Sequence, residues 1–100
     1  MDVQKTKLDG VLLITPRVFS DARGFFLESW SERAFKEAGI TCHFVQDNHS
    51  YSARQGTLRG LHMQLGPWAQ TKLAWCVRGE ALDVVVDLRP DSPLYRRWIM

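Results

Sequence analysis

Short apolar runs alternate with turn-forming residues along most of this chain, a pattern typical of β structure. The segments expected to be strands are residues 11–14, 25–30, 42–51, 56–64, 71–78, 81–88 and 94–100. Residues 20–24 are expected to form a turn, and Arg78-Gly79-Glu80 to join two strands as a hairpin. The pattern therefore predicts an all-β fold, an antiparallel β-sandwich or barrel, over a single domain of residues 1–100.

One helix is expected, in the N-terminal half and about two turns long. Ser29 followed by Glu32 resembles a capping box, and Gly39 is a typical residue for ending a helix. The apolar stripe between them consists of Ala34, Phe35 and Ala38. A helix of this length does not organise an all-helical domain, so it is expected to accompany the β structure.

Composition narrows the class of protein. With 45% hydrophobic and 24% charged residues, the chain is neither disordered nor fibrous. The net charge of +2 argues against a nucleic-acid partner, whereas the predominance of Arg over Lys suits a phosphate or carboxylate on a small ligand. Two cysteines without metal-ligand spacing, no apolar leader and no membrane-length apolar run favour a cytoplasmic protein without membrane contact.

The segment 56–64 carries the strongest candidate chemistry. In an extended strand His62 shares a face with Gly60 and Gln64, whereas Arg59 lies on the opposite face. A lone histidine in such a strand is more often a buried, hydrogen-bonded residue than a site residue. Polar side chains within the neighbouring apolar segments shift the balance towards a site or a polar network, because unpaired buried polar groups are costly.

The spacing around His62 resembles a degraded first cupin motif. Gly56, five intervening residues, His62-x-Gln64, and then Lys72, six intervening residues and Gly79 follow the motif's order. In metal-binding cupins the positions of Gln64 and Lys72 are histidine and glutamate ligands. Because a lysine ammonium group does not ligate a divalent cation, no metal and no other cofactor is expected.

Five ordered motifs then resemble one family, the dTDP-4-dehydrorhamnose 3,5-epimerases, which are metal-free jelly-roll enzymes. The motifs are DARGFFLE at 21–28, FVQDNHS at 44–50, LRGLHMQ at 58–64, QTKL at 70–73 and VRGEALDVVVDLR at 77–89. The resemblance implies a cupin-like jelly roll of which this chain forms about the leading half. It also implies a homodimer with strand exchange.

The resemblance implies an epimerase of a dTDP-linked 4-keto-6-deoxyhexose, acting at C3, C5 or both. The C4 carbonyl acidifies the neighbouring C–H bonds, so the reaction needs a base, a group that stabilises the enolate oxygen and an opposing acid. His62 suits the base and Lys72 the enolate partner, and Asp83 is a candidate to pair with either of them. The family's opposing tyrosine has no counterpart in these residues.

The resemblance also carries substrate-binding roles onto Arg23, Glu28, Gln46, Asn48 and Arg59. Arginine forks suit a diphosphate, whereas amide and carboxylate groups can read a base or sugar edge. Because Arg59 lies on the strand face opposite His62, it requires either a kink at Gly60 or a role in a neighbouring subunit's site.

Two alternatives stay open beside the epimerase. The chain can be a non-catalytic cupin that binds a nucleotide sugar or only dimerises, a reading supported by the missing opposing acid. A metal-dependent cupin oxygenase or isomerase is the third candidate and would require a metal bound through His62.

Overall fold

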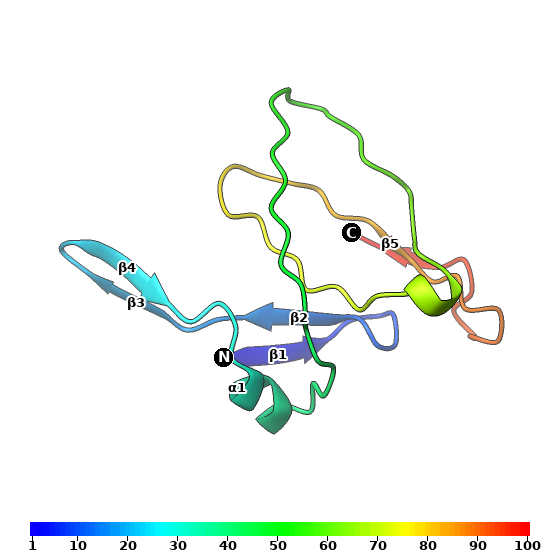
Figure 1. Ribbon diagram of the computed structural model, residues 1–100, viewed down its shortest axis with the longest axis horizontal. Helices are drawn as coiled ribbons and strands as arrows, with labels where there is room; N and C mark the ends of the chain where they lie inside the picture. Colours follow the sequence, from blue (N-terminus) through cyan, green and yellow to red (C-terminus); the bar gives the residue numbers. More distant parts are fainter. The chain divides into compact units, whose positions relative to one another are not determined.

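The computed structural model describes all of residues 1–100, and its strands pair as three antiparallel hairpins (Figure 1). β1 (Asp2–Lys5) pairs with β2 (Leu12–Thr15), β3 (Val18–Asp21) with β4 (Gly24–Leu27), and β5 (Val85–Val86) with β6 (Trp98–Ile99). The chain divides into two compact units, one formed by Met1–Ile40 with Cys76–Met100 and the other by Thr41–Trp75. The all-β class is confirmed, with one short helix as expected.

The β1–β2 hairpin opens the first unit. β2 is an expected strand, but β1 was not predicted because its residues are mostly polar. Pairing with an apolar partner stabilises β1, and the register places half-buried Val3 opposite half-buried Ile14. The connecting turn buries Leu8, which is only 2% exposed.

The β3–β4 hairpin confirms the turn expected at residues 20–24. Asp21 pairs with Gly24 across a two-residue connection, and Gly24 has φ of +134°, a conformation that residues with a Cβ rarely adopt. β3 itself was not predicted. Phe19 faces Phe26 across the hairpin, and both side chains are more than half exposed.

The N-cap of helix α1 (Glu32–Glu37) lies two residues later than the capping-box prediction placed it. Ser31, not Ser29, is the N-cap, and its Oγ accepts a hydrogen bond from the Ala34 N–H at 3.3 Å. The predicted end is confirmed: Gly39 has φ of +82°, and the Ile40 N–H donates to the Phe35 carbonyl at 2.8 Å. This is a Schellman ending, which requires a left-handed residue at the position of Gly39.

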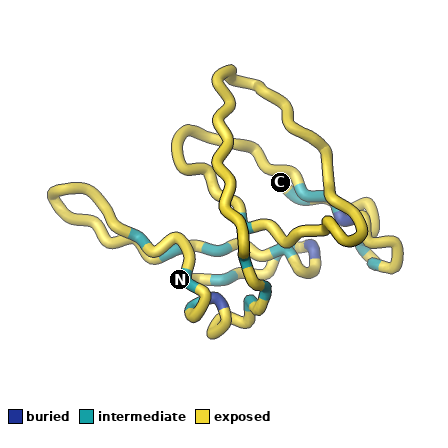
Figure 2. The backbone as a smooth tube through the Cα atoms, in the orientation of Figure 1, coloured by how far each residue is buried: buried dark blue, intermediate teal, exposed yellow.

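The second unit contains no strand, which contradicts the strands predicted at 42–51 and 56–64. Its regular element is a 3₁₀ turn, η1 (Gly66–Trp68), and a backbone hydrogen bond from Thr57 N to Arg54 O closes a further turn. The chain here runs as a long open trace (Figure 1) that is exposed along almost its whole length (Figure 2). Apolar alternation predicts an extended backbone, but a ladder also requires a second strand about 4.8 Å away.

The remaining strand predictions are corrected for the same reason. Residues 71–78 form no strand, residues 81–88 form a strand only at Val85–Val86, and residues 94–100 form a strand only at Trp98–Ile99. Residues 77–79 form a bend without paired strands on either side, so the hairpin predicted at Arg78-Gly79-Glu80 is wrong.

Burial is concentrated at three residues, Leu8, Phe35 and Asp87 (Figure 2). Phe35 lies on α1 and meets the Trp30 ring edge-on, with 6.5 Å between the ring centroids.

None of the helical segments has the length and apolar character needed to cross a bilayer.

Candidate functional site

His62 lies in the second unit, and the backbone of Gly60 leaves room for its imidazole ring. A Cβ atom built on Gly60 would stand 3.2 Å from His62 Nδ1 and 3.4 Å from the His62 backbone nitrogen. Gly60 also has φ of +116°, which only glycine adopts without strain. The positive φ therefore favours glycine two residues before the candidate base, and a Cβ at this position would crowd the His62 ring.

Lys72 is held by two amide side chains of the same unit. Its Nζ donates to Gln64 Oε1 at 2.9 Å and to Gln70 Oε1 at 2.5 Å. Gln64 is two residues from His62 and eight residues from Lys72, so this contact brings the segments of the candidate base and the candidate cation together. The η1 turn lies between Gln64 and Gln70 in the sequence.

Arg59 is anchored to the segment that precedes it. Its Nε donates to Ser52 Oγ at 3.0 Å, and its Nη2 donates to the Tyr51 carbonyl oxygen at 3.0 Å. A guanidinium group has five N–H donors, so donors remain for a ligand. The sequence did not indicate Ser52 and Tyr51 as partners, because they are seven and eight residues away.

Gln46 and Asn48, both exposed in the second unit, contact each other. Gln46 Nε2 donates to Asn48 Oδ1 at 3.1 Å. Each amide keeps further donors and acceptors, so the pair can present a hydrogen-bonding edge to a base or sugar.

Arg23 lies in the first unit, in the turn of the β3–β4 hairpin, and its side chain is 91% exposed. It forms an ion pair with Asp21, with 2.7 Å between Arg23 Nη2 and Asp21 Oδ2, and its backbone N–H donates to Asp21 Oδ1. The side-chain hydrogen bond from Arg23 holds the pKa of the Asp21 carboxyl below its usual range. Arg23 also lines a hollow between the two strands, and exposed Glu28 follows β4 directly.

Asp83 lies in the first unit, exposed and ahead of β5, whereas strand alternation predicted an inward side chain. Of the eight predicted site residues, the second unit holds His62, Lys72, Arg59, Gln46 and Asn48, and the first holds Asp83, Arg23 and Glu28. Within the second unit the structure joins Lys72 to the segment of His62 and joins Gln46 to Asn48. The roles of the eight residues stay predictions.

The sequence did not predict the polar cluster that forms around the buried Asp87. The Asp87 carboxylate accepts hydrogen bonds from Arg89 Nε at 2.9 Å and from Ser92 Oγ at 2.5 Å. Arg89 also donates from Nη2 to the carbonyl oxygen of Asp9, 80 residues earlier, which ties the β1–β2 turn to the β5–β6 hairpin. The Arg89 and Ser92 side chains hold the pKa of Asp87 far below its usual range. The sequence shows Asp87 and Arg89 two residues apart, but it does not indicate the contact of Arg89 with Asp9.

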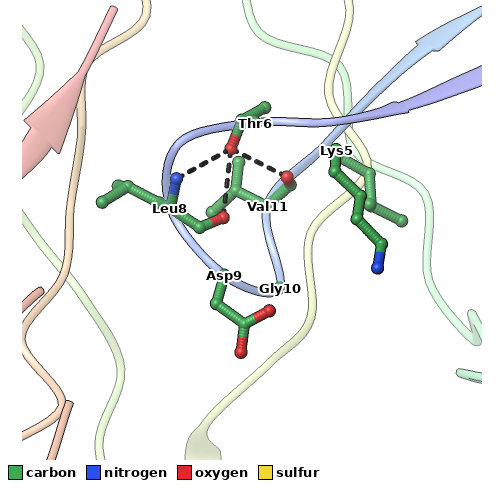
Figure 3. A pocket seen from close by; sticks show the side chains of 7 residues that line it. Lys5, Thr6, Leu8, Asp9, Gly10 and Val11 are labelled. Atoms are coloured by element: carbon green, nitrogen blue, oxygen red, sulfur yellow. Dashed lines mark hydrogen bonds between the residues drawn. The ribbon is translucent and has the colours of Figure 1, made fainter. Parts of the chain in front are cut away.

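The β1–β2 turn forms a small pocket (Figure 3), lined by Lys5, Thr6, Leu8, Asp9, Gly10, Val11 and Leu12. The Thr6 hydroxyl oxygen lies 2.9 Å from the Val11 carbonyl oxygen and accepts the Leu8 N–H at 3.2 Å. Its hydrogen-bonding capacity is therefore used within the turn, and no predicted site residue lines this pocket.

Nowhere in the chain do three or more His, Cys, Asp or Glu side chains gather as a set of metal ligands.

Known proteins are similar to this chain in sequence and in fold. The sequence model of the family described as dTDP-4-dehydrorhamnose 3,5-epimerase matches residues 5–100. The proteins of that name from Shigella flexneri and Escherichia coli K12 are 53% and 48% identical to this chain over 100 residues, 99% of its length. A crystal structure of the Bacillus anthracis protein of that name, with TDP and PPi bound, superimposes with a TM-score of 0.93 at 49% identity and covers 98% of this chain.

An all-β chain that matches such an enzyme structure over almost its whole length falls in the class of cupin-like epimerases. The chain belongs to the dTDP-4-dehydrorhamnose 3,5-epimerase family. It spans about half the length of its matched relatives, covering 55% of the Shigella protein and 56% of the Bacillus chain.

Proposed function

We propose that this chain is the part of a single cupin-type domain that carries the base and the enolate-stabilising cation of a dTDP-4-keto-6-deoxyhexose epimerase. The observation that carries the proposal is the 2.9 Å hydrogen bond between Lys72 Nζ and Gln64 Oε1. It places an ammonium group against the segment that presents the His62 imidazole, and this pairing is what enolate chemistry beside a ketone requires.

In the proposed reaction the C4 carbonyl of the sugar acidifies the C–H bonds at C3 and C5. The His62 imidazole takes a proton from one of these carbons, and the electron pair of the C–H bond moves to form the enolate. The Lys72 ammonium donates a hydrogen bond to the enolate oxygen. A proton delivered to the opposite face of the same carbon restores the ketone and inverts the centre.

We assign binding of the nucleotide part of the substrate to the arginine and amide side chains. Arg59, anchored by Ser52 and the Tyr51 carbonyl, keeps donors for a diphosphate oxygen. The Gln46–Asn48 pair suits the thymine or sugar edge. TDP bound to the Bacillus anthracis relative supports a dTDP-linked ligand.

We further propose that the protein acts as a homodimer in the cytoplasm. The β3–β4 hairpin supports the dimer: Phe25 and Phe26 are 73% and 71% exposed, and because they are adjacent in the strand they point to opposite faces. A second copy of this chain would cover these faces. The two free cysteines, Cys42 and Cys76, fit a reducing compartment. Sedimentation that shows a dimer for the wild type and a monomer for Phe26→Asp tests the assembly.

Solvent deuterium exchange at C3 and C5 of a dTDP-4-keto-6-deoxyhexose tests the chemistry in the full-length protein. We expect wild-type exchange, its loss in His62→Ala and retained TDP binding in that variant. TDP binding without any wild-type exchange would instead assign the non-catalytic, nucleotide-binding function, which the anchored Arg59 supports equally well.

A further inference from the structure

The Lys72 ammonium group donates hydrogen bonds to two uncharged side chains. An ammonium group has three N–H donors, and Lys72 uses two of them on the amide oxygens of Gln64 and Gln70. Because both acceptors are uncharged, these contacts fix the position of the nitrogen without neutralising its charge.

The two amides reach Lys72 from different parts of the chain. Gln70 is two residues away, so in an extended segment it lies on the same side as Lys72. Gln64 is eight residues away and lies across the η1 turn (Gly66–Trp68). That turn is fixed locally by Gly66, with φ of +57°, by Pro67, and by a 3.1 Å hydrogen bond from the Ala69 N–H to the Gly66 carbonyl. The long and flexible lysine side chain is thereby held from two directions.

We propose that Gln64 and Gln70 are positioning residues for Lys72: they clamp its ammonium group as an uncompensated cation and leave its third N–H for an anionic ligand oxygen. The proposal rests on the proposed function for the identity of that oxygen, the enolate oxygen of the bound sugar. A carboxylate at either position would hold the nitrogen equally well but would offset the charge that stabilises the enolate. An amide is therefore the side chain that positions without neutralising.

The clamp itself is tested without catalysis. In the full-length protein, ¹H–¹⁵N NMR of lysine side chains measures hydrogen exchange at Lys72 Nζ. We expect Gln64→Met and Gln70→Met, which keep the side-chain length but remove the acceptor, each to accelerate this exchange severalfold. Gln55→Met is the matched control, since Gln55 is an exposed glutamine of the same unit that takes no part in the clamp. Unchanged Lys72 exchange in both clamp variants would overturn the proposal.

The role of the charge is tested by Gln64→Glu, which keeps an acceptor oxygen and adds a carboxylate. We expect Lys72 hydrogen exchange to stay at the wild-type rate, whereas kcat for deuterium exchange into the sugar falls about tenfold with KM changed less than about threefold. A purely structural role predicts the opposite, with Gln64→Glu close to wild type in kcat and Gln64→Met impaired. That result would overturn the proposal.

Failure of the proposed function is distinguishable from failure of the clamp. If the wild type exchanges no sugar proton, the epimerase proposal fails. The NMR measurement in the Met variants then decides whether the clamp exists, and the affinity of TDP for Gln64→Glu relative to Gln55→Glu decides whether its charge serves a bound anion. If the wild type is inactive and Gln64→Glu and Gln55→Glu bind TDP with equal affinity, the charge of Lys72 contacts neither an enolate nor TDP. That result would overturn the role proposed for the clamp.

Discussion

Substitution of Gly60 by alanine tests whether the backbone before His62 sets the position of the imidazole ring. The added Cβ would stand 3.2 Å from His62 Nδ1 and 3.7 Å from Cε1, so the ring must move by a few tenths of an ångström. At φ of +116° the backbone also becomes strained, at a cost of about 1–3 kcal/mol.

Gly56→Ala is the matched control because it separates these two effects. Gly56 also has a positive φ, +78°, but a Cβ at this position meets no atom within 4 Å. We expect about 1–2 kcal/mol of backbone strain and no displacement of His62 in this variant. Urea unfolding should therefore show both variants destabilised to a comparable extent.

The site readout distinguishes the two variants. Displacement of a reacting group by about 1 Å costs roughly a hundredfold in rate, so a shift of a few tenths should slow deuterium exchange into the sugar about tenfold in Gly60→Ala. The ¹H–¹⁵N signals of the His62 ring should move in Gly60→Ala and stay unchanged in Gly56→Ala. Equal exchange rates and unchanged ring signals in the two variants would refute the reasoning.

Three further predictions concern the rest of the chain. Phe35→Ala should lower the free energy of unfolding by about 3–5 kcal/mol in urea denaturation followed by tryptophan fluorescence, and a loss below 1 kcal/mol would contradict its place in the core. Because the folded-state pKa of Asp87 lies below its unfolded value of 3.8, its contribution to the free energy of unfolding is present above that pH and is lost as the pH falls further. In Asp87→Asn the free energy of unfolding should therefore fall less steeply below pH 3.8 than in the wild type. An equally steep fall in both proteins would contradict this reasoning. Ser52→Ala should weaken TDP binding about two- to fivefold by releasing Arg59, measured by calorimetry against Ser50→Ala, and equal affinities would count against that anchoring.

Turns and helix ends could be predicted from the sequence because short-range chemistry determines them. The turn at Asp21–Gly24 and the helix ending at Gly39 depend on a few adjacent residues and on the freedom of glycine at positive φ. The helix start was placed two residues early because both Ser29 and Ser31 have a suitable hydroxyl, and only the Ser31 Oγ reaches the Ala34 N–H.

Strand pairing and long-range polar contacts could not be predicted in the same way. Alternation marks residues 42–51 and 56–64 as extended, but it carries no information on whether a partner strand lies beside them. The hydrogen bond from Arg89 to the Asp9 carbonyl closes a loop of 80 residues, and nothing near either residue indicates the other. The contact of Lys72 with Gln64 depends in turn on the η1 turn, whose Leu-Gly-Pro-Trp sequence had no predicted structure.

A shared spacing explains why so much of the site is nevertheless visible in the sequence. Several of its polar side chains contact a partner two residues away, in the pairs Asp21–Arg23, Gln46–Asn48 and Gln70–Lys72. The pair Asp87–Arg89, outside the predicted site, has the same spacing. Because the partners are only two residues apart, these contacts form at the cost of closing a very short loop. Gln46–Asn48 and Gln70–Lys72 form in segments that pair with no strand. The arrangement allows segments without ladder hydrogen bonds to orient their own polar side chains. The Lys72–Gln64 contact spans eight residues, as the contact of Arg59 with the Tyr51 carbonyl does. Because it joins two such segments, its loss should release Lys72 from the segment of His62 while leaving every two-residue pair in place.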